Sequence, residues 1–196
     1  MLEGLSDLEV LETPPDPNKS QPCRVSVQGI SGSGKTTLGR ELERRLGVRH
    51  LETDALVHGP GWAETPDEEL RTLLLEFMAK GDRWVIDSDY RRKVGTMVLE
   101  AADTVIWLDM PLHVCLHRLW RRTRRRISGN EPLWNDNQES WRTALVGWDS
   151  LFVYAVRKHV TQRRRLPALL GRPELAHLRV VRLRSPRQLR RWLDAL

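Results

Sequence analysis

Cysteine is scarce in this chain of 196 residues, which contains only Cys23 and Cys115. Two cysteines supply neither a disulfide framework nor a zinc ligand set, so a reducing cytoplasm is the expected location. The chain also lacks an apolar run of about 18 residues, and it lacks a basic start followed by an apolar segment. The sequence therefore predicts no membrane span and no signal peptide.

Acidic residues are scarce in the C-terminal half. Residues 101–196 contain 19 Lys and Arg but 8 Asp and Glu, a net charge of +11, whereas residues 1–100 contain 13 and 18, a net charge of −5. The basic half is expected to meet anions, and nucleotide phosphates, a phosphorylated substrate and nucleic acid all fit this charge.

The length suits one well-buried core. Residues 1–22 are acidic and rich in proline, and we expect them to form a flexible N-terminal extension. Residues 23–196 are expected to form a single domain.

One glycine-rich stretch matches a phosphate-binding pattern at every fixed position. The stretch that fits G-x-x-x-x-G-K-S/T is Gly29-Ile30-Ser31-Gly32-Ser33-Gly34-Lys35-Thr36. In such a loop, glycines let the backbone curl so that N–H groups face phosphate oxygens, the lysine reaches the terminal phosphates and the threonine hydroxyl binds Mg²⁺. The sequence therefore predicts a site for ATP and Mg²⁺ formed by Gly29, Ser31, Gly32, Ser33, Gly34, Lys35, Thr36 and Thr37.

Hydrophobic patterns place this loop between a strand and a helix. Residues 23–27 alternate apolar and polar, and leucines recur every four residues over 35–46, with Gly47 placed to end the helix. Apolar strands alternating with helices predict an α/β fold, the three-layer P-loop NTPase fold, with a five-stranded parallel sheet and helices on both faces. The other strands are expected at 48–52, 83–87, 104–109 and 178–183, and the other helices at 66–80 with Thr65 as N-cap, 90–101, 111–126, 138–158 and 186–193.

Further motifs carry a resemblance to a known class of enzymes. They are Asp54-Ala55-Leu56 followed by Gly61-Trp62, Trp84-Val85-Ile86-Asp87 with Tyr90, and residues 102–109 and 133–140. Together with the glycine loop, they resemble the P-loop small-molecule kinases of adenylate-kinase-like fold, and most closely the bacterial group often labelled adenylate kinase-like ATPases or DNA topology modulation proteins. That group usually reads Asp-Gly-Asn-Tyr where this chain has Asp87-Ser88-Asp89-Tyr90. The resemblance covers nearly all of the chain after residue 22 and implies phosphoryl transfer from ATP.

Phosphoryl transfer needs a metal-bound donor phosphate, cations on the transferring group, and a residue that orients or deprotonates the acceptor. Lys35 and Thr36 provide the first of these. In related kinases, the acidic positions that correspond to Asp54 and Asp87 hold Mg²⁺ or face the acceptor. We therefore assign Asp54 to the acceptor as a base or orienter, and Asp87 with Thr36 to the metal. The alternative is that each aspartate caps a helix or forms a turn.

Six arginines lie within residues 118–126. Four of them share one helical face, and their charges repel one another unless anions neutralise them. In the kinases that the chain resembles, a mobile lid presents arginines to the donor phosphates, which implies a short arginine-rich helical lid at approximately 118–137. A solvated charged face is the alternative. On the lid reading, Arg118, Arg122 and Arg125 are catalytic and Arg121 binds the nucleotide.

Acceptor contacts are expected in the loops around residues 54–65, 88–95 and 130–140. Besides Asp54, the candidates are Trp62, Asp89, Arg91, Arg92 and Trp134, and the two tryptophans are suited to stacking on a planar group. The remaining tryptophans of apolar stripes and strands are expected in the core, namely Trp84, Trp107, Trp141, Trp148 and Trp192.

The leading hypothesis is an ATP- and Mg²⁺-dependent kinase that transfers the γ-phosphate to a small hydroxylated or phosphorylated acceptor. Among such acceptors, a nucleoside or nucleotide is favoured. A kinase that acts on nucleic acid, at a 5′-end or a modified base in DNA, is one alternative, which the basic residues Arg157, Lys158 and 163–165 favour. A nucleotide-dependent regulatory or DNA-associated ATPase is the other. No feature of the sequence indicates an oligomeric state.

Overall fold

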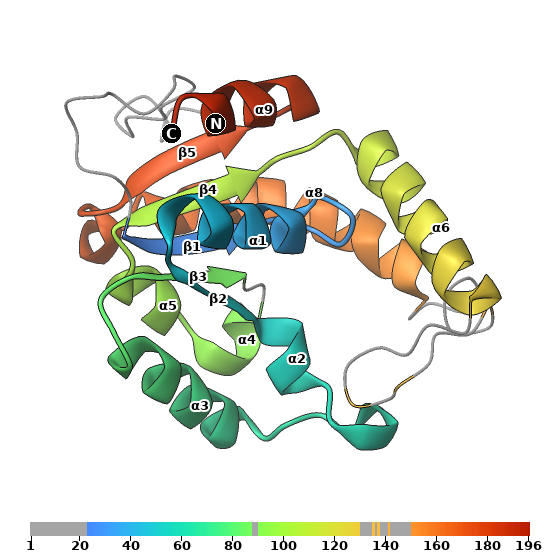
Figure 1. Ribbon diagram of the computed structural model, residues 1–196, viewed down its shortest axis with the longest axis horizontal. Coiled ribbons are helices and arrows are strands. Elements are labelled where there is room, and N and C mark those ends of the chain that lie inside the picture. Colours follow the sequence, from blue (N-terminus) through green and yellow to red (C-terminus); the bar gives the residue numbers. More distant parts are fainter. Residues whose placement is uncertain (1–22, 88–89, 130–134, 136, 138–140, 142–149) are drawn as a thin grey trace.

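Five parallel strands form the centre of the molecule (Figure 1). The structure, a computed structural model, describes residues 23–87, 90–129, 135, 137, 141 and 150–196. All neighbouring strands pair in parallel, so their carboxyl ends meet at one edge of the sheet, in the spatial order β2-β3-β1-β4-β5. The predicted α/β fold with a five-stranded parallel sheet is confirmed. The strands are β1 (Arg24–Gln28), β2 (Arg49–Glu52), β3 (Trp84–Asp87), β4 (Thr104–Leu108) and β5 (Arg179–Leu183).

Helices cover both faces of this sheet. Neighbouring residues of one strand point to opposite faces, so Ile86 and Val105 join one apolar cluster while Val85 and Ile106 join the other. The first cluster is covered by α3 (Asp67–Ala79), α4 (Arg91–Val94), α5 (Met97–Ala101) and α8 (Leu151–Leu170). The second is covered by α1 (Lys35–Leu46) and α9 (Pro186–Asp194).

Helix α1 has the bounds that the sequence predicts. Glycine flanks it on both sides in the left-handed region, with φ of 105° at Gly34 and 62° at Gly47. The Gly47 N–H donates to the carbonyl of Glu43 over 3.0 Å and so ends the helix. Leu38, Leu42 and Leu46 are buried against the sheet.

The predicted N-cap of α3, Thr65, is wrong. The helix begins at Asp67, with Pro66 in the cap position and no side-chain cap bond. The Thr65 hydroxyl instead donates to the carbonyl of Leu56, 2.6 Å away. The first turn is stabilised by three acidic residues that complement the helix dipole, Asp67, Glu68 and Glu69.

The predicted helices at 90–101 and 138–158 also differ from the structure. Gly95, with a φ of 63°, separates the first into α4 and α5. Helix α8 begins after Ser150 and continues beyond residue 158, through the basic run 163–165, because buried Leu166 and Leu170 extend its apolar face. Residues 138–140 and 142–149 of the predicted helix lie outside the described residues.

The tryptophans divide between core and surface. Trp84, Trp107 and Trp192 are buried, as predicted. Trp141 is 38% exposed, so its assignment to the core is wrong; its ring lies 5.3 Å from that of Trp120, itself 41% exposed. Trp148 lies outside the described residues.

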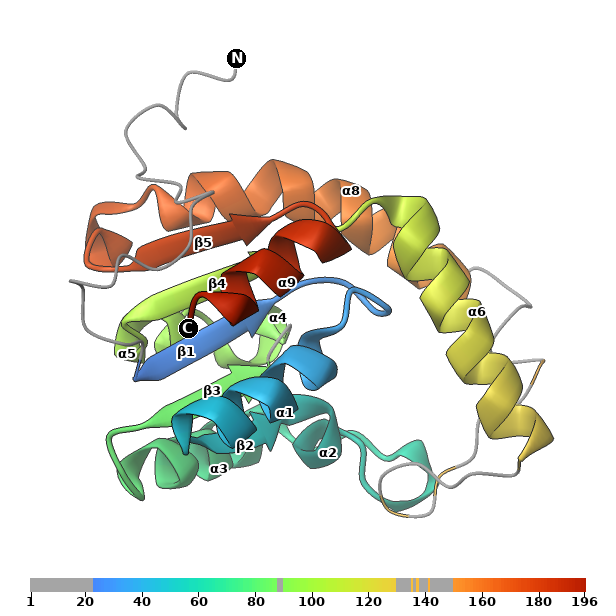
Figure 2. The same ribbon diagram turned by 45° about the horizontal axis from the view of Figure 1, so that its top comes forward.

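Helix α6 (Leu112–Ser128) stands beyond the carboxyl ends of the strands, across from α1 and from α2 (Thr53–Val57). Figures 1 and 2 show this placement from two directions. Two short 3₁₀ segments, η2 (Pro60–Trp62) and η4 (Pro173–Leu175), complete the described elements. None of the described helices combines the length and the hydropathy that a membrane crossing requires.

Adjacent leucines of α3 test the assignment of the core. Leu74 is fully buried, whereas Leu75 is 56% exposed. We expect Leu74→Ala to lower the free energy of unfolding by about 3 kcal/mol, because the substitution leaves a cavity. The matched variant Leu75→Ala is expected to change it by less than about 0.5 kcal/mol. Urea unfolding measures both, and equal losses would contradict the packing described for α3.

Candidate active site

The glycine loop between β1 and α1 is tightly turned and packed against α6. Gly32 and Gly34 have φ of 80° and 105°, and the Ser33 N–H donates to the carbonyl of Ile30 over 3.0 Å. A Cβ atom on Gly32 would lie 2.3 Å from the carbonyl oxygen of Cys115 in α6. Glycine is therefore required at position 32 both by backbone conformation and by this close approach.

A cleft of about 850 Å³ opens beside this loop. Its walls come from the loop, the start of α1, the end of β2, the start of α2 and one side of α6. The cleft therefore lies where the carboxyl ends of parallel strands place a ligand site. The lining residues are Ile30, Ser31, Gly32, Gly34, Lys35, Thr36, Thr37, Arg40, Glu52, Asp54, Arg118, Arg122, Arg125, Arg126 and Leu189.

Two carboxylates lie against the threonine hydroxyl of the loop. The Thr36 Oγ1 atom is 2.7 Å from Asp87 Oδ2 and 2.9 Å from Glu52 Oε1. Lys35 Nζ lies 4.0 Å from Asp87 Oδ1. Glu52 and Asp87 are the last residues of β2 and β3 and pair in the sheet register, which brings them side by side.

Glu52 is a site residue that sequence reasoning missed. The sequence pattern places Glu52 in the strand 48–52 without a functional role and assigns the acceptor role to Asp54 instead. The signal that would have found it is its position as the last residue of a strand next to the strand that ends in Asp87.

Asp87 is almost completely buried. Burial raises its pKa to about 6, because the charged carboxylate loses hydration, while Lys35 and the Thr36 hydroxyl oppose this shift. Asp54 and Glu52 act in the same direction as burial, since like charges disfavour a second negative charge. The site is therefore short of positive charge, and a cation bound beside Asp87 would be stabilised.

The oxygen atoms at this point suit a magnesium ion. Among the described residues, no group of three or more His, Cys, Asp and Glu side chains is placed to hold a metal alone. Mg²⁺ usually keeps several waters and takes one or two carboxylates together with substrate phosphates. Thr36, Asp87 and Glu52 fit that incomplete, oxygen-only donor set.

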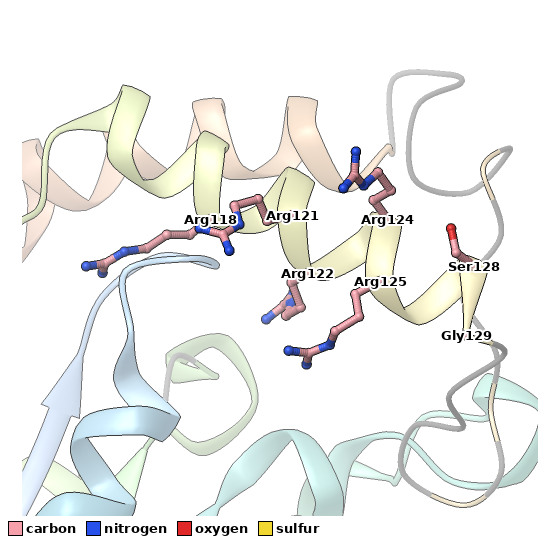
Figure 3. A pocket seen from close by; sticks show the side chains of 7 residues that line it. All are labelled: Arg118, Arg121, Arg122, Arg124, Arg125, Ser128 and Gly129. Atoms are coloured by element: carbon pink, nitrogen blue, oxygen red, sulfur yellow. The ribbon is translucent and has the colours of Figure 1, made fainter.

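The arginines of α6 point in different directions, as Figure 3 shows. Arg118 reaches the glycine loop, where its Nη1 atom donates to the carbonyl of Ser33 over 3.0 Å. Arg122 and Arg125 extend on the cleft side of α6, whereas Arg124 extends from the other side. Arg121 lines the hollow along α6 with its neighbours but not the cleft beside the loop.

Asp54 lies in the first turn of α2, two residues beyond β2, and forms part of the cleft wall. Its Oδ1 atom accepts a hydrogen bond of 2.7 Å from the Tyr90 hydroxyl, and the same hydroxyl lies 3.1 Å from His58 Nε2. The His58 ring is edge-on to the ring of Trp62, with 5.4 Å between centroids. Tyr90 belongs to a sequence motif with Asp87, and His58 carries no sequence signal of its own; only the fold brings the two side chains to Asp54.

The turn that carries Trp62 is held by two asparagines from the segment beyond α6. Asn137 is buried; its Oδ1 atom accepts from the Trp62 N–H and its Nδ2 atom donates to the carbonyl of Gly59, each over 2.9 Å. Asn135 Nδ2 donates to the carbonyl of His58 over 2.6 Å. Trp62 has a φ of 63°, unusual for a residue other than glycine, and its side chain is 42% exposed.

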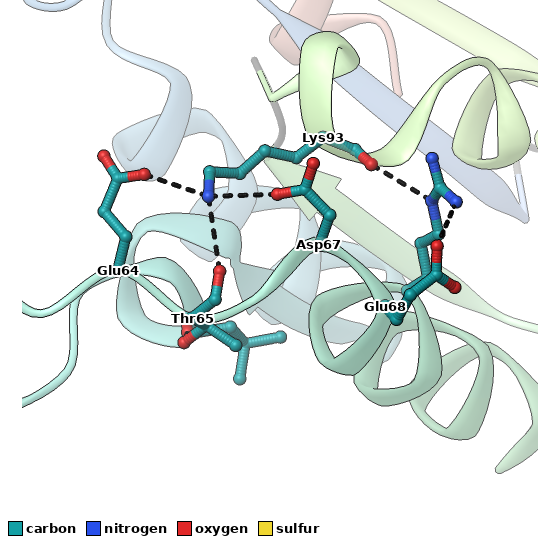
Figure 4. Close-up of polar contacts among 7 residues, drawn as sticks. Glu64, Thr65, Asp67, Glu68 and Lys93 are labelled. Carbon is teal, nitrogen blue, oxygen red and sulfur yellow. Dashed lines mark hydrogen bonds and ion pairs between the residues drawn. The ribbon is translucent and has the colours of Figure 1, made fainter.

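A group of ion pairs fixes α4, which begins next to Tyr90, against the start of α3 (Figure 4). Lys93 Nζ lies 2.9 Å from Glu64 Oε2 and 3.2 Å from both Asp67 Oδ1 and the carbonyl oxygen of Thr65. The carbonyl of Lys93 in turn accepts from Arg71 over 3.0 Å.

The structure gathers some of the predicted site residues and not others. Lys35, Thr36, Asp54, Arg118, Arg122 and Arg125 line one cleft, and Asp87 lies beside Lys35 and Thr36. Gly29 and Ser33 shape the loop without lining the cleft, and Trp62, Arg91, Arg92 and Arg121 do not line it either. Asp89 and Trp134 lie outside the described residues.

Arg163, one of the basic residues that favoured a nucleic-acid substrate, has a structural role. Asp109, which follows β4, is buried and lies 2.6 Å from Arg163 Nε and 2.6 Å from Arg182 Nη2. The guanidinium of Arg182 also lies over the ring of Trp107, 4.2 Å from its centroid. Arg163 therefore neutralises a buried carboxylate, and its charge is not an indication of nucleic-acid binding.

No family model matches the sequence. The chain is 31% identical over 129 residues to a shikimate kinase from Microcystis aeruginosa, across 57% of this chain and 65% of that protein. It is 34% identical over 121 residues to a cytidylate kinase from Thermosipho africanus, across 57% of this chain and 52% of that protein. The chain thus spans less than two thirds of either relative.

The fold has counterparts among solved structures. A shikimate kinase from Bacteroides thetaiotaomicron matches with a TM-score of 0.51 at 18% identity, over 89% of this chain and 96% of that chain. The similar proteins are P-loop small-molecule kinases of adenylate-kinase-like fold, as the sequence motifs predicted. The finer resemblance to the adenylate kinase-like ATPase group stays a prediction.

The raised pKa of Asp87 predicts a specific pH dependence of stability in the absence of Mg²⁺ and nucleotide. Because the pKa in the folded chain is about 6 and the ordinary value is 3.8, the folded state holds the proton more tightly. The contribution of Asp87 to stability therefore falls as the pH rises from about 4 to about 6, by about 3 kcal/mol in total.

The variant Asp87→Asn carries no charge and avoids this loss. We expect its melting temperature to exceed that of the wild type at pH 7.5 and the difference to shrink as the pH falls toward 4. Calorimetric melting across this pH range measures the difference. A difference independent of pH would show that the Asp87 carboxylate ionises without cost in the fold.

Proposed function

We propose that this protein is an ATP- and Mg²⁺-dependent phosphotransferase that transfers the γ-phosphate to a small hydroxylated acceptor. The leading candidate for that acceptor is a nucleoside or nucleotide. One observation carries the proposal. The glycine loop, Thr36, Glu52 and Asp54 line a single cleft together with Arg118, Arg122 and Arg125 of α6, and Asp87 lies directly behind Thr36. A donor, a metal and an acceptor can therefore meet there.

In the donor half, the backbone N–H groups of the loop and the start of α1 bind the phosphates of ATP. Lys35 places a positive charge on the transferring phosphate. Thr36, Asp87 and Glu52 would hold Mg²⁺, and a magnesium ion bound there would supply positive charge for the phosphate oxygens. Catalysis in such a site comes from positioning and from fixed charges rather than from covalent chemistry.

We assign the lid to approximately residues 118–137, of which the structure describes 118–129, 135 and 137. Arg122 and Arg125 extend on the cleft side of α6 and line the same cleft as the glycine loop, where the donor phosphates would lie. A bidentate guanidinium suits phosphate oxygens better than an ammonium does. Arg118, already bonded to the loop, anchors the helix at the donor end.

In the acceptor half, Asp54 takes the proton of the attacking hydroxyl. The acceptor oxygen bonds to the γ-phosphorus, the bond from that phosphorus to the β-phosphate oxygen of ADP breaks, and the released proton passes to the free Asp54 carboxylate oxygen. Trp62 does not line the cleft, but its exposed ring beside His58 is available to stack on a planar ring of an acceptor that extends out of the cleft. The relatives named shikimate kinase and cytidylate kinase support a small acceptor without choosing its class.

A panel of acceptors tests this function. ADP release from Mg–ATP is measured with nucleosides, nucleotides, sugars, shikimate and oligonucleotides, for the wild type and for Lys35→Ala. We expect at least one small acceptor to raise turnover at least about 100-fold above the Lys35→Ala background, because the variant loses a charge on the transferring phosphate. A response to oligonucleotides alone would favour the nucleic-acid kinase, and no response at all would favour an ATPase that transfers nothing.

Two neighbouring arginines of α6 test the lid. Arg122→Gln removes a guanidinium from the cleft, and we expect the KM for ATP to rise about 10-fold, equivalent to about 1.4 kcal/mol. Arg124→Gln removes the same charge from the side of α6 that faces away from the cleft, and little change is expected. Steady-state kinetics at varied ATP distinguishes the two, and equal effects would assign the arginines to general electrostatics instead of a phosphate contact.

A further inference from the structure

Tyr90 contacts the Asp54 carboxylate, and His58 contacts Tyr90 in turn. The Tyr90 hydroxyl donates to Asp54 Oδ1 over 2.7 Å and lies 3.1 Å from His58 Nε2. Asp54 lines the cleft, whereas Tyr90 and His58 do not. These two residues therefore act on anything bound in the cleft through Asp54.

The direction of the hydrogen bonds follows from the number of protons available. A tyrosine hydroxyl has one proton, and an ionised carboxylate only accepts. With the Tyr90 proton given to Asp54, the contact to His58 is a hydrogen bond only if His58 Nε2 carries a proton and donates to the Tyr90 oxygen. The chain of donors then runs from His58 through Tyr90 to Asp54.

The residues of this hydrogen-bond series are held in place by the backbone or by ion pairs. His58 follows α2, and its N–H donates to the carbonyl of Asp54 over 3.1 Å, so the ring and the carboxylate sit on one short turn. Tyr90 directly precedes α4, which Lys93 ties to Glu64 and Asp67 (Figure 4). Side chains held in this way keep their geometry when a ligand binds.

We propose that Tyr90 is a positioning residue for Asp54 and that His58 orients the Tyr90 hydroxyl. The bond occupies Oδ1 and fixes the plane of the carboxylate, so that Oδ2 is the oxygen left to accept the proton of the acceptor hydroxyl. This assignment rests on the proposed function, in which Asp54 is the acceptor-side base. It adds two residues whose contribution is to geometry alone.

The first test measures the bond without any acceptor. Tyr90→Phe removes only the hydroxyl, and we expect it to lower the melting temperature by about 2–4 °C. In the Asp54→Ala background the same substitution is expected to lower the melting temperature by clearly less, because only the contact with His58 is left to lose. Equal shifts in both backgrounds would overturn the contact.

The second test separates positioning from a merely structural role. Transfer is followed with cytidine 5′-monophosphate, or with whichever member of the acceptor panel the wild type uses best. For Tyr90→Phe we expect kcat to fall about 10- to 100-fold with the KM for ATP unchanged, because a misplaced base slows the chemical step alone. The matched control is Tyr154→Phe, at the exposed second tyrosine of the chain, which is expected to leave kcat unchanged.

Variants of His58 test the direction of the hydrogen bonds from His58 through Tyr90 to Asp54. His58→Gln keeps an N–H donor near the position of Nε2 and is expected to retain most of kcat, whereas His58→Leu is expected to lose as much as Tyr90→Phe. Unchanged kcat in Tyr90→Phe, or equal loss in both His58 variants, would overturn the proposal while leaving the kinase function intact. Failure of the wild type to phosphorylate any acceptor is a different result, which would contradict the proposed function itself.

Discussion

The interaction on which the site depends is the contact of the Thr36 hydroxyl with the carboxylates of Asp87 and Glu52. It joins the first residues of α1 to the carboxyl ends of β2 and β3, which the parallel register brings together. The buried Asp87 carboxylate is tolerated beside Lys35, and together with the partly exposed Glu52 it can accept a further cation. The glycine loop, held between these acids and α6, is thereby fixed at the point where phosphates would bind.

The proposed donor and acceptor halves of the site depend on different parts of the chain. The donor half is built by local sequence, since the loop, Lys35 and Thr36 are consecutive. The surroundings of Asp54 in the proposed acceptor half come from α2, from Tyr90 just before α4 and from two asparagines beyond α6, which meet only in the folded chain. Acceptor specificity can therefore vary among similar folds while the donor site stays the same.

This difference explains how much of the molecule sequence patterns could predict. The loop and α1 were predicted to the residue, and all five strands were placed within a residue or two, because apolar periodicity and a glycine pattern are local signals. Glu52 and the Tyr90–His58 pair were missed, because their roles come from the register of β2 on β3 and from the packing of α4. The predicted helix cap at Thr65 and the predicted burial of Trp141 are wrong for the same reason, because tertiary contacts decide both. The Thr65 hydroxyl donates to the carbonyl of Leu56, and Trp141 lies against the exposed Trp120.

In the proposed site, Asp87 serves the donor and the metal while Asp54 serves the acceptor. Titration calorimetry of ATP, with and without Mg²⁺, tests it most directly on Asp54→Asn and Asp87→Asn. We predict that Asp54→Asn binds Mg–ATP within about 3-fold of the wild type, a difference below about 1 kcal/mol, whereas Asp87→Asn loses the tightening that Mg²⁺ brings. Loss of the Mg²⁺ effect in Asp54→Asn, with the effect retained in Asp87→Asn, would contradict this division of roles.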